Sequence, residues 1–84
     1  MKWIKHFNSM VNLDRVAEIS LIDYTESDTP FLRESETPFH IYFGSQSLEA
    51  IMSAEFETHI EALEVLTTIN AFINDNSPVN VLEI

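Results

Sequence analysis

The side chains in this sequence that could do chemistry are mainly carboxylates, and they are concentrated in the segment 23–36. Carboxylate oxygens are the ligands that hard cations such as Ca²⁺ prefer. A calcium loop needs ligands in a one-three-five rhythm and a central glycine, and this segment has neither. We therefore expect a solvated loop and no metal site. Its acidic residues are Asp23, Glu26, Asp28, Glu34 and Glu36.

The histidines are too scattered to predict a metal site or a catalytic pair. None of His6, His40 and His59 has a second histidine three to five residues away, and the sequence has no cysteine. A zinc centre is therefore not expected. His40 draws the most interest because it should share one face of a strand with Tyr42, but a single histidine there is typical of a surface position. We expect each histidine to be structural or exposed.

Sequence motifs for catalysis are missing as well. There is no Gly-x-Ser-x-Gly, no phosphate-binding loop and no dinucleotide fingerprint, and a single glycine rules out any glycine-rich loop. A chain of 84 residues also has little volume for a concave, partly dry pocket. We expect a protein that is not an enzyme and carries no cofactor.

The net charge is the most unusual property of the sequence. It is −10, and the four basic residues, Lys2, Lys5, Arg15 and Arg33, all precede position 34. From there to the end the chain has nine carboxylates and neither lysine nor arginine: Glu34, Glu36, Glu49, Glu55, Glu57, Glu61, Glu64, Asp75 and Glu83. Nucleic acids and anionic membranes bind through lysine and arginine, so they are poor partners. A protein with a basic surface is the expected partner.

Length and composition predict a single domain, residues 1–84. The apolar fraction of 45% is ordinary for a globular protein. Disulfides are excluded because there is no cysteine, and we find neither the apolar stretch of a signal peptide nor a run long enough to span a bilayer. We expect a cytoplasmic protein. Because so small a domain buries a limited core, a homodimer is an open alternative to a monomer.

Alternation of apolar and polar residues predicts three strands before residue 44. The first is 2–7, the second is 16–24, reached through a turn at 11–16, and the third is 39–43. Between the last two, the segment 25–38 is rich in serine, threonine, proline and acids, so it should form a long loop. We expect Gly44 to supply the following turn.

The segment 47–56 fits two structures. As a strand it alternates over its whole length and forms a hairpin with 39–43, whereas as a helix it groups Leu48, Ile51 and Met52 on one side. Its leucine, glutamate, alanine and methionine content suits a helix. We favour the strand, because the alternation is unbroken and a turn precedes it.

A helix is predicted over about 59–74. Thr58 and Glu61 have the spacing of a capping box, in which the Thr58 hydroxyl accepts from the Glu61 amide and the Glu61 carboxylate reaches back. An apolar stripe follows at spacings of three and four, and the run 74–78 with its proline ends it. The stripe contains Ala62, Leu63, Leu66, Ile69, Phe72 and Ile73. The segment 79–84 is left either as a short edge strand or as a loose end.

These elements predict an α+β fold: a three- to four-stranded antiparallel sheet with one C-terminal helix packed on one face. The other face should then be open and partly apolar, which suggests an interface. The alternative is that 79–84 or the long loop covers it. The residues expected on or near this face are Trp3 or Phe7, Ile22, Tyr24, Tyr42 and Ile51.

The turn and strand at 11–16, the hairpin at 39–56 and the helix start at 56–62 together resemble a loose set of small, mostly uncharacterised bacterial and phage proteins. These are built as a strand meander followed by one helix, and the resemblance spans about residues 3–73. It implies a fold and carries over no active site. The acidic loop and unbalanced charge also look similar to small phage-encoded inhibitors, including anti-CRISPR proteins and nucleic-acid mimics.

The charge and the open face predict a non-catalytic binding module that occupies a basic, nucleic-acid-binding site on a host protein, as a phage-type inhibitor would. The alternative is a homo-oligomeric structural protein, in which the open face or an edge strand pairs with its symmetry mate. The residues expected to bind the partner are Asp23, Glu26, Asp28, Glu34, Glu36, Tyr42, Glu49 and Glu55.

Overall fold

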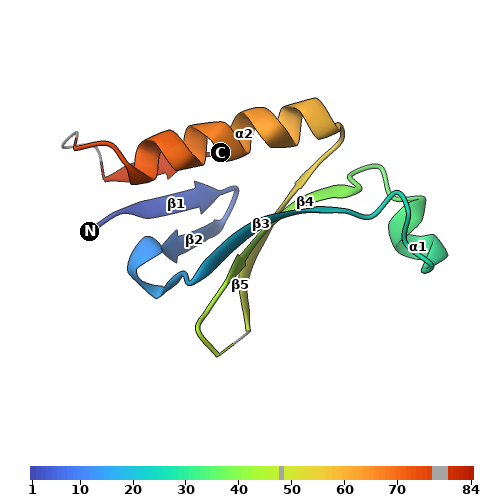
Figure 1. Cartoon of the computed structure of the whole chain (residues 1–84), viewed down its shortest axis with the longest axis horizontal. Helices are drawn as coiled ribbons and strands as arrows, with labels where there is room; N and C mark the ends of the chain where they lie inside the picture. Colours follow the sequence, from blue (N-terminus) through green and yellow to red (C-terminus); the bar gives the residue numbers. More distant parts are fainter. Residues whose placement is uncertain (48, 77–79) are drawn as a thin grey trace.

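The computed structural model describes residues 1–47, 49–76 and 80–84, and the fold is α+β as predicted. The described residues form six strands, the long helix α2 and two short helical segments, arranged as Figure 1 shows. Their bounds are β1 Trp3–His6, β2 Ser9–Asn12, the 3-10 turn Leu13–Arg15, β3 Glu18–Asp23, α1 Pro30–Arg33, β4 Phe39–Gly44, β5 Ala50–Phe56, α2 His59–Ile73 and β6 Val81–Glu83.

The strands β3, β4 and β5 form one antiparallel sheet in chain order, which we call the meander sheet. Its register pairs Leu21 with Ile41 and Ile41 with Ala54. Exposed and buried side chains alternate along β5 from Ile51 to Phe56. The strand prediction for 47–56 is therefore confirmed over Ala50–Phe56, and the helical alternative is wrong there; Leu48 lies outside the described residues.

A second sheet corrects the prediction of one continuous sheet. The hairpin of β1 and β2 is joined by β6, which runs parallel to β1, and we call this the terminal sheet. The segment 11–16 was predicted as a turn. Its first two residues, Val11 and Asn12, instead belong to β2, where Val11 is paired with Ile4. The final segment forms an edge strand, the first of the two alternatives; its residue Val79 lies outside the described part.

Two local predictions also need correction. The long loop 25–38 contains the short helix α1, which Pro30 begins in the position that proline favours. Gly44 does not form the turn after β4 but is the last residue of that strand, at a shift in the register with β5. The turn itself is closed by the Ser45 amide, which donates to the Glu49 carbonyl at 2.9 Å.

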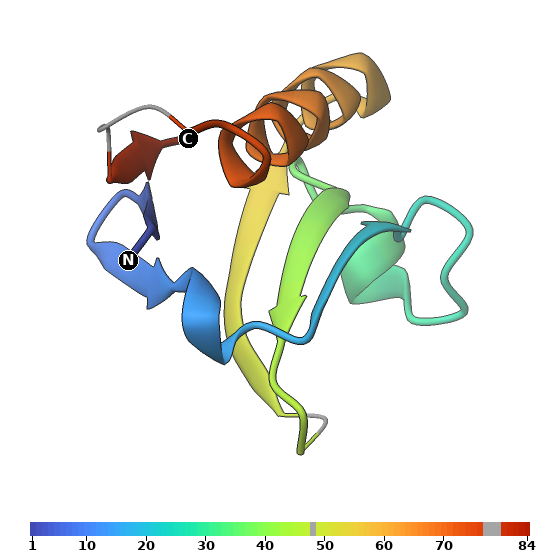
Figure 2. The same ribbon diagram turned by 60° about the vertical axis from the view of Figure 1, so that its left-hand side comes forward.

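One hydrophobic core lies between the two sheets and α2. In Figure 2 the sheets lie side by side beneath the helix. Each sheet contributes its inner face and α2 contributes one side, so apolar side chains from all three are removed from water together. The buried members are Ile4, Val11, Ile41, Phe43, Met52, Ala54, Phe56, Ala62, Ile69 and Phe72.

The start of α2 follows the prediction in part. The Thr58 hydroxyl accepts a hydrogen bond from the Glu61 amide at 3.1 Å, which satisfies one free donor of the first turn. A return bond from the Glu61 carboxylate is not among the contacts of the described residues. Within the expected stripe Ala62 and Ile69 are buried, but Leu63 is 41% exposed because α2 turns this side chain toward solvent.

The end of α2 is held by the N-terminus of the chain. The Lys2 ammonium donates to the carbonyls of Phe72 and Asp75, and to that of Ile73 at 3.2 Å. It also lies 5.0 Å from the centre of the Phe72 ring. A cation here adds a donor to the carbonyls at the end of α2 and complements the negative end of the helix dipole. Lys2 therefore fastens the terminal sheet to α2.

We expect Ile69→Val to lower the free energy of unfolding by about 1 kcal/mol, because it removes one buried methylene from the centre of the core. The matched change Ile60→Val, at a side chain that is 70% exposed, should stay within about 0.5 kcal/mol of the wild type. Urea denaturation of both variants checks this. Equal losses at the two positions would contradict the placement of the core.

We expect Lys2→Met to lower the free energy of unfolding by about 1 to 2 kcal/mol, because the terminal carbonyls of α2 lose their cation. Lys5→Met removes the same charge from β1 without changing the contact with α2, so it should lower the free energy of unfolding by less. Thermal or urea denaturation of the pair measures the difference. A larger loss for Lys5→Met would show that the α2 contact is not what matters.

Candidate functional site

The outer face of the meander sheet is turned away from α2. Two cross-strand rows form it, one of Ser20, Tyr42 and Ser53 and one of Ile22, His40 and Glu55. The helix packs on the opposite face and β6 pairs with β1, so neither covers it. Figure 1 places α1 beyond the end of the sheet where β3 stops and β4 starts.

The predicted open face is correct for some residues and wrong for others. Ile22, Tyr42 and Ile51 fall on the outer face of the meander sheet by their register. Trp3 belongs to the terminal sheet, and Phe7 lies at the tip of its hairpin, because β1 pairs with β2 and β6 and has no place in the meander sheet.

Tyr42 lies along its own strand against Gly44. A Cβ atom at Gly44 would come within 2.7 Å of the Tyr42 ring. The only glycine of the chain thus gives the ring room to lie close to the strand, which is a role that the prediction of a turn did not anticipate. Tyr42 is half-buried as a result.

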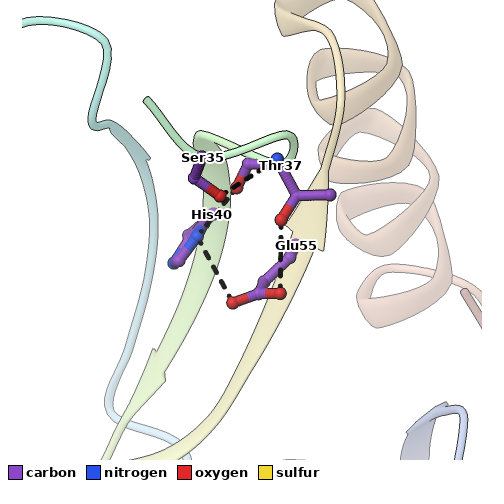
Figure 3. Close-up of polar contacts among 4 residues, drawn as sticks. All are labelled: Ser35, Thr37, His40 and Glu55. Carbon is purple, nitrogen blue, oxygen red and sulfur yellow. Dashed lines mark hydrogen bonds and ion pairs between the residues drawn. The ribbon is translucent and has the colours of Figure 1, made fainter. Parts of the chain in front are cut away.

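One end of the outer face carries a polar cluster, which we call the His40 cluster: Ser35, Thr37, His40 and Glu55 (Figure 3). The His40 Nε2 atom lies 3.0 Å from the Thr37 carbonyl and 3.5 Å from Glu55 Oε1. The Thr37 hydroxyl donates to Glu55 Oε2 at 3.3 Å, and the Ser35 hydroxyl accepts from the Thr37 amide at 3.1 Å.

These contacts fix the loop before β4 against β4 and β5. Both Glu55 oxygens and the His40 Nε2 face groups of the protein, and the Tyr24 ring lies edge-on to His40 with ring centres 4.7 Å apart. The cluster therefore holds Glu55 in a defined position at the sheet edge. It also places the loop beside a groove that Glu55 and Thr37 share.

This groove, which we call the acidic groove, has a volume of about 630 Å³. It lies between the end of β5, the start of α2 and the tip of the β1–β2 hairpin. Three carboxylates, Glu55, Glu57 and Glu61, contribute to its wall, and none of the lining residues is lysine or arginine. The full lining is His6, Phe7, Asn8, Ser9, Thr37, Ser53, Glu55, Phe56, Glu57 and Glu61.

The hairpin tip contributes an exposed aromatic side chain to the lining of the groove. Phe7 is 78% exposed, and its φ of 51° is unusual for a bulky residue. The His6 ring lies between Phe7 and Phe56, with ring centres 4.5 Å and 5.9 Å away, and its Nδ1 is 3.1 Å from the Ile84 carbonyl. The tip is thus held by contacts with β5 and with the end of the chain.

The residues predicted to bind a partner do not form one surface. Tyr42 and Glu55 share the outer face of the meander sheet, whereas Glu49 precedes β5 at the opposite end of the hairpin. The remaining five lie at the end of β3 or in the segment before β4, where all are exposed: Asp23, Glu26, Asp28, Glu34 and Glu36.

Sequence reasoning missed most of the acidic groove. His6 and Phe7 were expected in the first strand, and Glu57 and Glu61 were seen only as part of a charge count or a helix cap. The one signal available was the density of carboxylates at 55–61. That signal could not show that a hairpin some fifty residues earlier lies against the same segment.

In the part of the chain that the structure describes, no three histidine, aspartate or glutamate side chains are grouped closely enough to hold a metal ion. Among the same residues, no helix is both long and apolar enough to cross a membrane.

Comparison with known proteins gives no match to any family model, to any curated protein or to any solved structure. The resemblance to small bacterial and phage proteins therefore stays an expectation.

Asp23 closes the end of β3 onto the loop. Its Oδ1 accepts from the Thr25 hydroxyl at 2.6 Å and from the Thr25 amide at 2.8 Å. These two hydrogen bonds, the hydroxyl first, hold the pKa of the Asp23 carboxyl below its ordinary value. A lowered pKa in the folded state means that the ionised form stabilises the fold.

The stability contributed by ionised Asp23 should be present above about pH 4 and disappear as the pH falls through the lowered folded pKa. We expect Asp23→Asn to be less stable than the wild type at pH 6 and the difference to shrink toward pH 2 to 3. Urea denaturation at several pH values checks this, with Asp28→Asn as a control that removes a nearby charge. A difference independent of pH would contradict it.

Proposed function

We propose that this protein is a non-catalytic binding module whose acidic groove receives a basic segment of another protein. The observation that carries the proposal is the set of three carboxylates, Glu55, Glu57 and Glu61, in a groove without a lining lysine or arginine. Opposite charges across an interface speed association and select the partner. The partner contributes arginine or lysine side chains.

The groove combines this charge with an aromatic contact. Exposed aromatic residues next to a concave surface are frequent anchors of protein interfaces. Both Phe7, which is exposed, and Phe56, which is only 6% exposed, line the groove. An arginine side chain suits such a site, because its guanidinium can stack on a ring and bond a carboxylate at the same time.

The acidic groove supports this function better than the long loop does. The carboxylates of the loop and those of the groove are all exposed, and isolated exposed ion pairs contribute little to affinity. In the groove, by contrast, Glu55 is already oriented by Thr37 and His40, so less side-chain freedom is lost when a partner binds.

The biological role that fits is that of an inhibitor covering a nucleic-acid-binding site on a host protein, since such sites are basic. A phage-type inhibitor, which the sequence resemblance suggests, would have this role. It would act in the cytoplasm. Direct nucleic-acid binding is not proposed, because a net charge of −10 would repel phosphates.

We expect the triple variant Glu55→Gln, Glu57→Gln, Glu61→Gln to bind a short synthetic peptide of alternating arginine and alanine about tenfold more weakly than the wild type, as three modest charge pairs are lost. Calorimetry at low salt measures this. Glu61→Gln leaves the backbone amide that donates to the Thr58 hydroxyl unchanged, so the first turn of α2 should still form.

The matched control is Glu26→Gln, Glu34→Gln, Glu36→Gln, which removes the same charge from the long loop and should leave affinity within about twofold. Wild-type affinity should also fall as salt rises. Equal losses in both triple variants, or affinity that ignores ionic strength, would refute the groove as the binding site.

A further inference from the structure

A second interaction surface lies along β3, at the edge of the meander sheet opposite to β5 and the acidic groove. In the described part of the chain β3 pairs with β4 alone, and Figure 2 shows it as the outermost strand of its sheet. Beyond the strand end the Tyr24 amide donates to the Pro38 carbonyl, which continues the ladder. Even-numbered residues of β3 therefore bond toward β4, because hydrogen-bonded pairs alternate along antiparallel strands.

The odd-numbered residues then direct their backbone groups toward the free edge. Ile19 and Leu21 are the central ones, and their side chains lie on the inner face, packed against the core. An exposed strand edge of this kind is a template for another strand. It is flanked by Glu18 and Asp23, but residues 19–22 carry no charge.

An apolar groove of about 410 Å³ borders this edge. It is lined by Ile19 from β3 and by the C-terminal half of α2, where Ile73 is 43% exposed. Residues 65–73 of α2 also carry no charge, although the whole chain has a net charge of −10. The lining residues are Ile19, Leu66, Thr67, Ile69, Asn70 and Ile73.

We infer that this edge and groove pair with a second copy of the chain, so that two β3 strands join two meander sheets into one antiparallel sheet of six strands. The charge distribution selects this occupant. A basic partner is drawn to the carboxylates, whereas an acidic copy meets the least repulsion at a surface without charge. A two-fold dimer, in which both copies use the same surface, is also the commonest closed oligomer.

The geometry limits the register of the pair. When the inner faces of both copies lie on the same side of the joined sheet, an odd-numbered residue of β3 can lie opposite only another odd-numbered residue. Even-numbered residues likewise pair only with even-numbered ones, so each side chain is opposite one from the same face. Pairing centred on Ser20 places Ile19 opposite Leu21 of the second copy. Pairing centred on Leu21 would instead place Asp23 opposite Ile19, beside the apolar groove, where a carboxylate would lose water without gaining a partner.

The Ser20-centred register has a specific consequence. Ser20 of one copy lies directly opposite Ser20 of the other, in a pair without backbone hydrogen bonds, where side chains approach most closely. Two like charges at this position would oppose each other across the two-fold axis, while two opposite charges would attract.

The test is a charge swap at Ser20, read by analytical ultracentrifugation between about 10 µM and about 1 mM protein. The wild type should show a concentration-dependent dimer. Ser20→Asp and Ser20→Lys should each raise the dimer Kd about tenfold or more, and an equimolar mixture of the two should recover a dimer. The controls are Ser53→Asp and Ser53→Lys, which sit in the same cross-strand row beyond Tyr42 and should dimerise like the wild type.

Salt separates this interface from the acidic groove. Raising the ionic strength from about 0.01 M to about 1 M shortens the screening length from about 30 Å to about 3 Å, which should strengthen the dimer and weaken the arginine peptide. A wild type that is monomeric at all concentrations, or a dimer that neither Ser20 variant weakens, would overturn the inference. Peptide binding by Ser20→Asp reports on the groove separately and shows that the variant is folded.

Discussion

The fold depends on the packing together of the terminal sheet, the meander sheet and α2, which are not joined to one another by a ladder of backbone hydrogen bonds. Ile4 of the terminal sheet, Ile41 and Phe43 of the meander sheet and Ile69 of α2 belong to one buried cluster, and each is at most 1% exposed. The inner faces of both sheets and one side of α2 are removed from water together in this cluster. Because burial against α2 holds the two sheets in place, it also fixes how their edges face each other.

The acidic groove is a product of that arrangement. The hairpin tip with Phe7 is brought against the end of β5, and the start of α2 supplies Glu61 on the third side. Lys2 contributes from a distance, since it fastens the terminal sheet to the last turn of the helix. The groove is therefore a place where separate elements meet, which is where binding sites often occur in small folds.

The two proposed surfaces divide the molecule by charge. Three carboxylates line the groove, whereas residues 19–22 of β3 and the C-terminal half of α2 carry none. A chain with a net charge of −10 repels its own copies over most of its surface, so an uncharged stretch on it restricts where self-association can occur. Pairing at β3 would leave the groove open, because the groove is lined by β5, at the opposite edge of the meander sheet, and by the hairpin tip.

Local chemistry allowed the individual elements to be predicted from sequence. Alternation identified β4 and the body of β5, and Thr58 with its hydroxyl cap marked the start of α2, because these signals depend on neighbours in the chain. The terminal sheet was missed, since Ser9 and Met10 give no clear alternation and β6 is only three residues long. Gly44 was misread because its role depends on where the Tyr42 ring lies.

The sequence by itself determined the fold class, the charge and the identity of the helix, since periodicity and composition are properties of the chain alone. The tertiary structure decided that there are two sheets and that β6 pairs with β1 across the length of the chain. It also decided that Phe7, Glu55 and Glu61 line one groove. Such contacts depend on how the buried faces pack, and local periodicity does not specify which distant segments meet when they are removed from water.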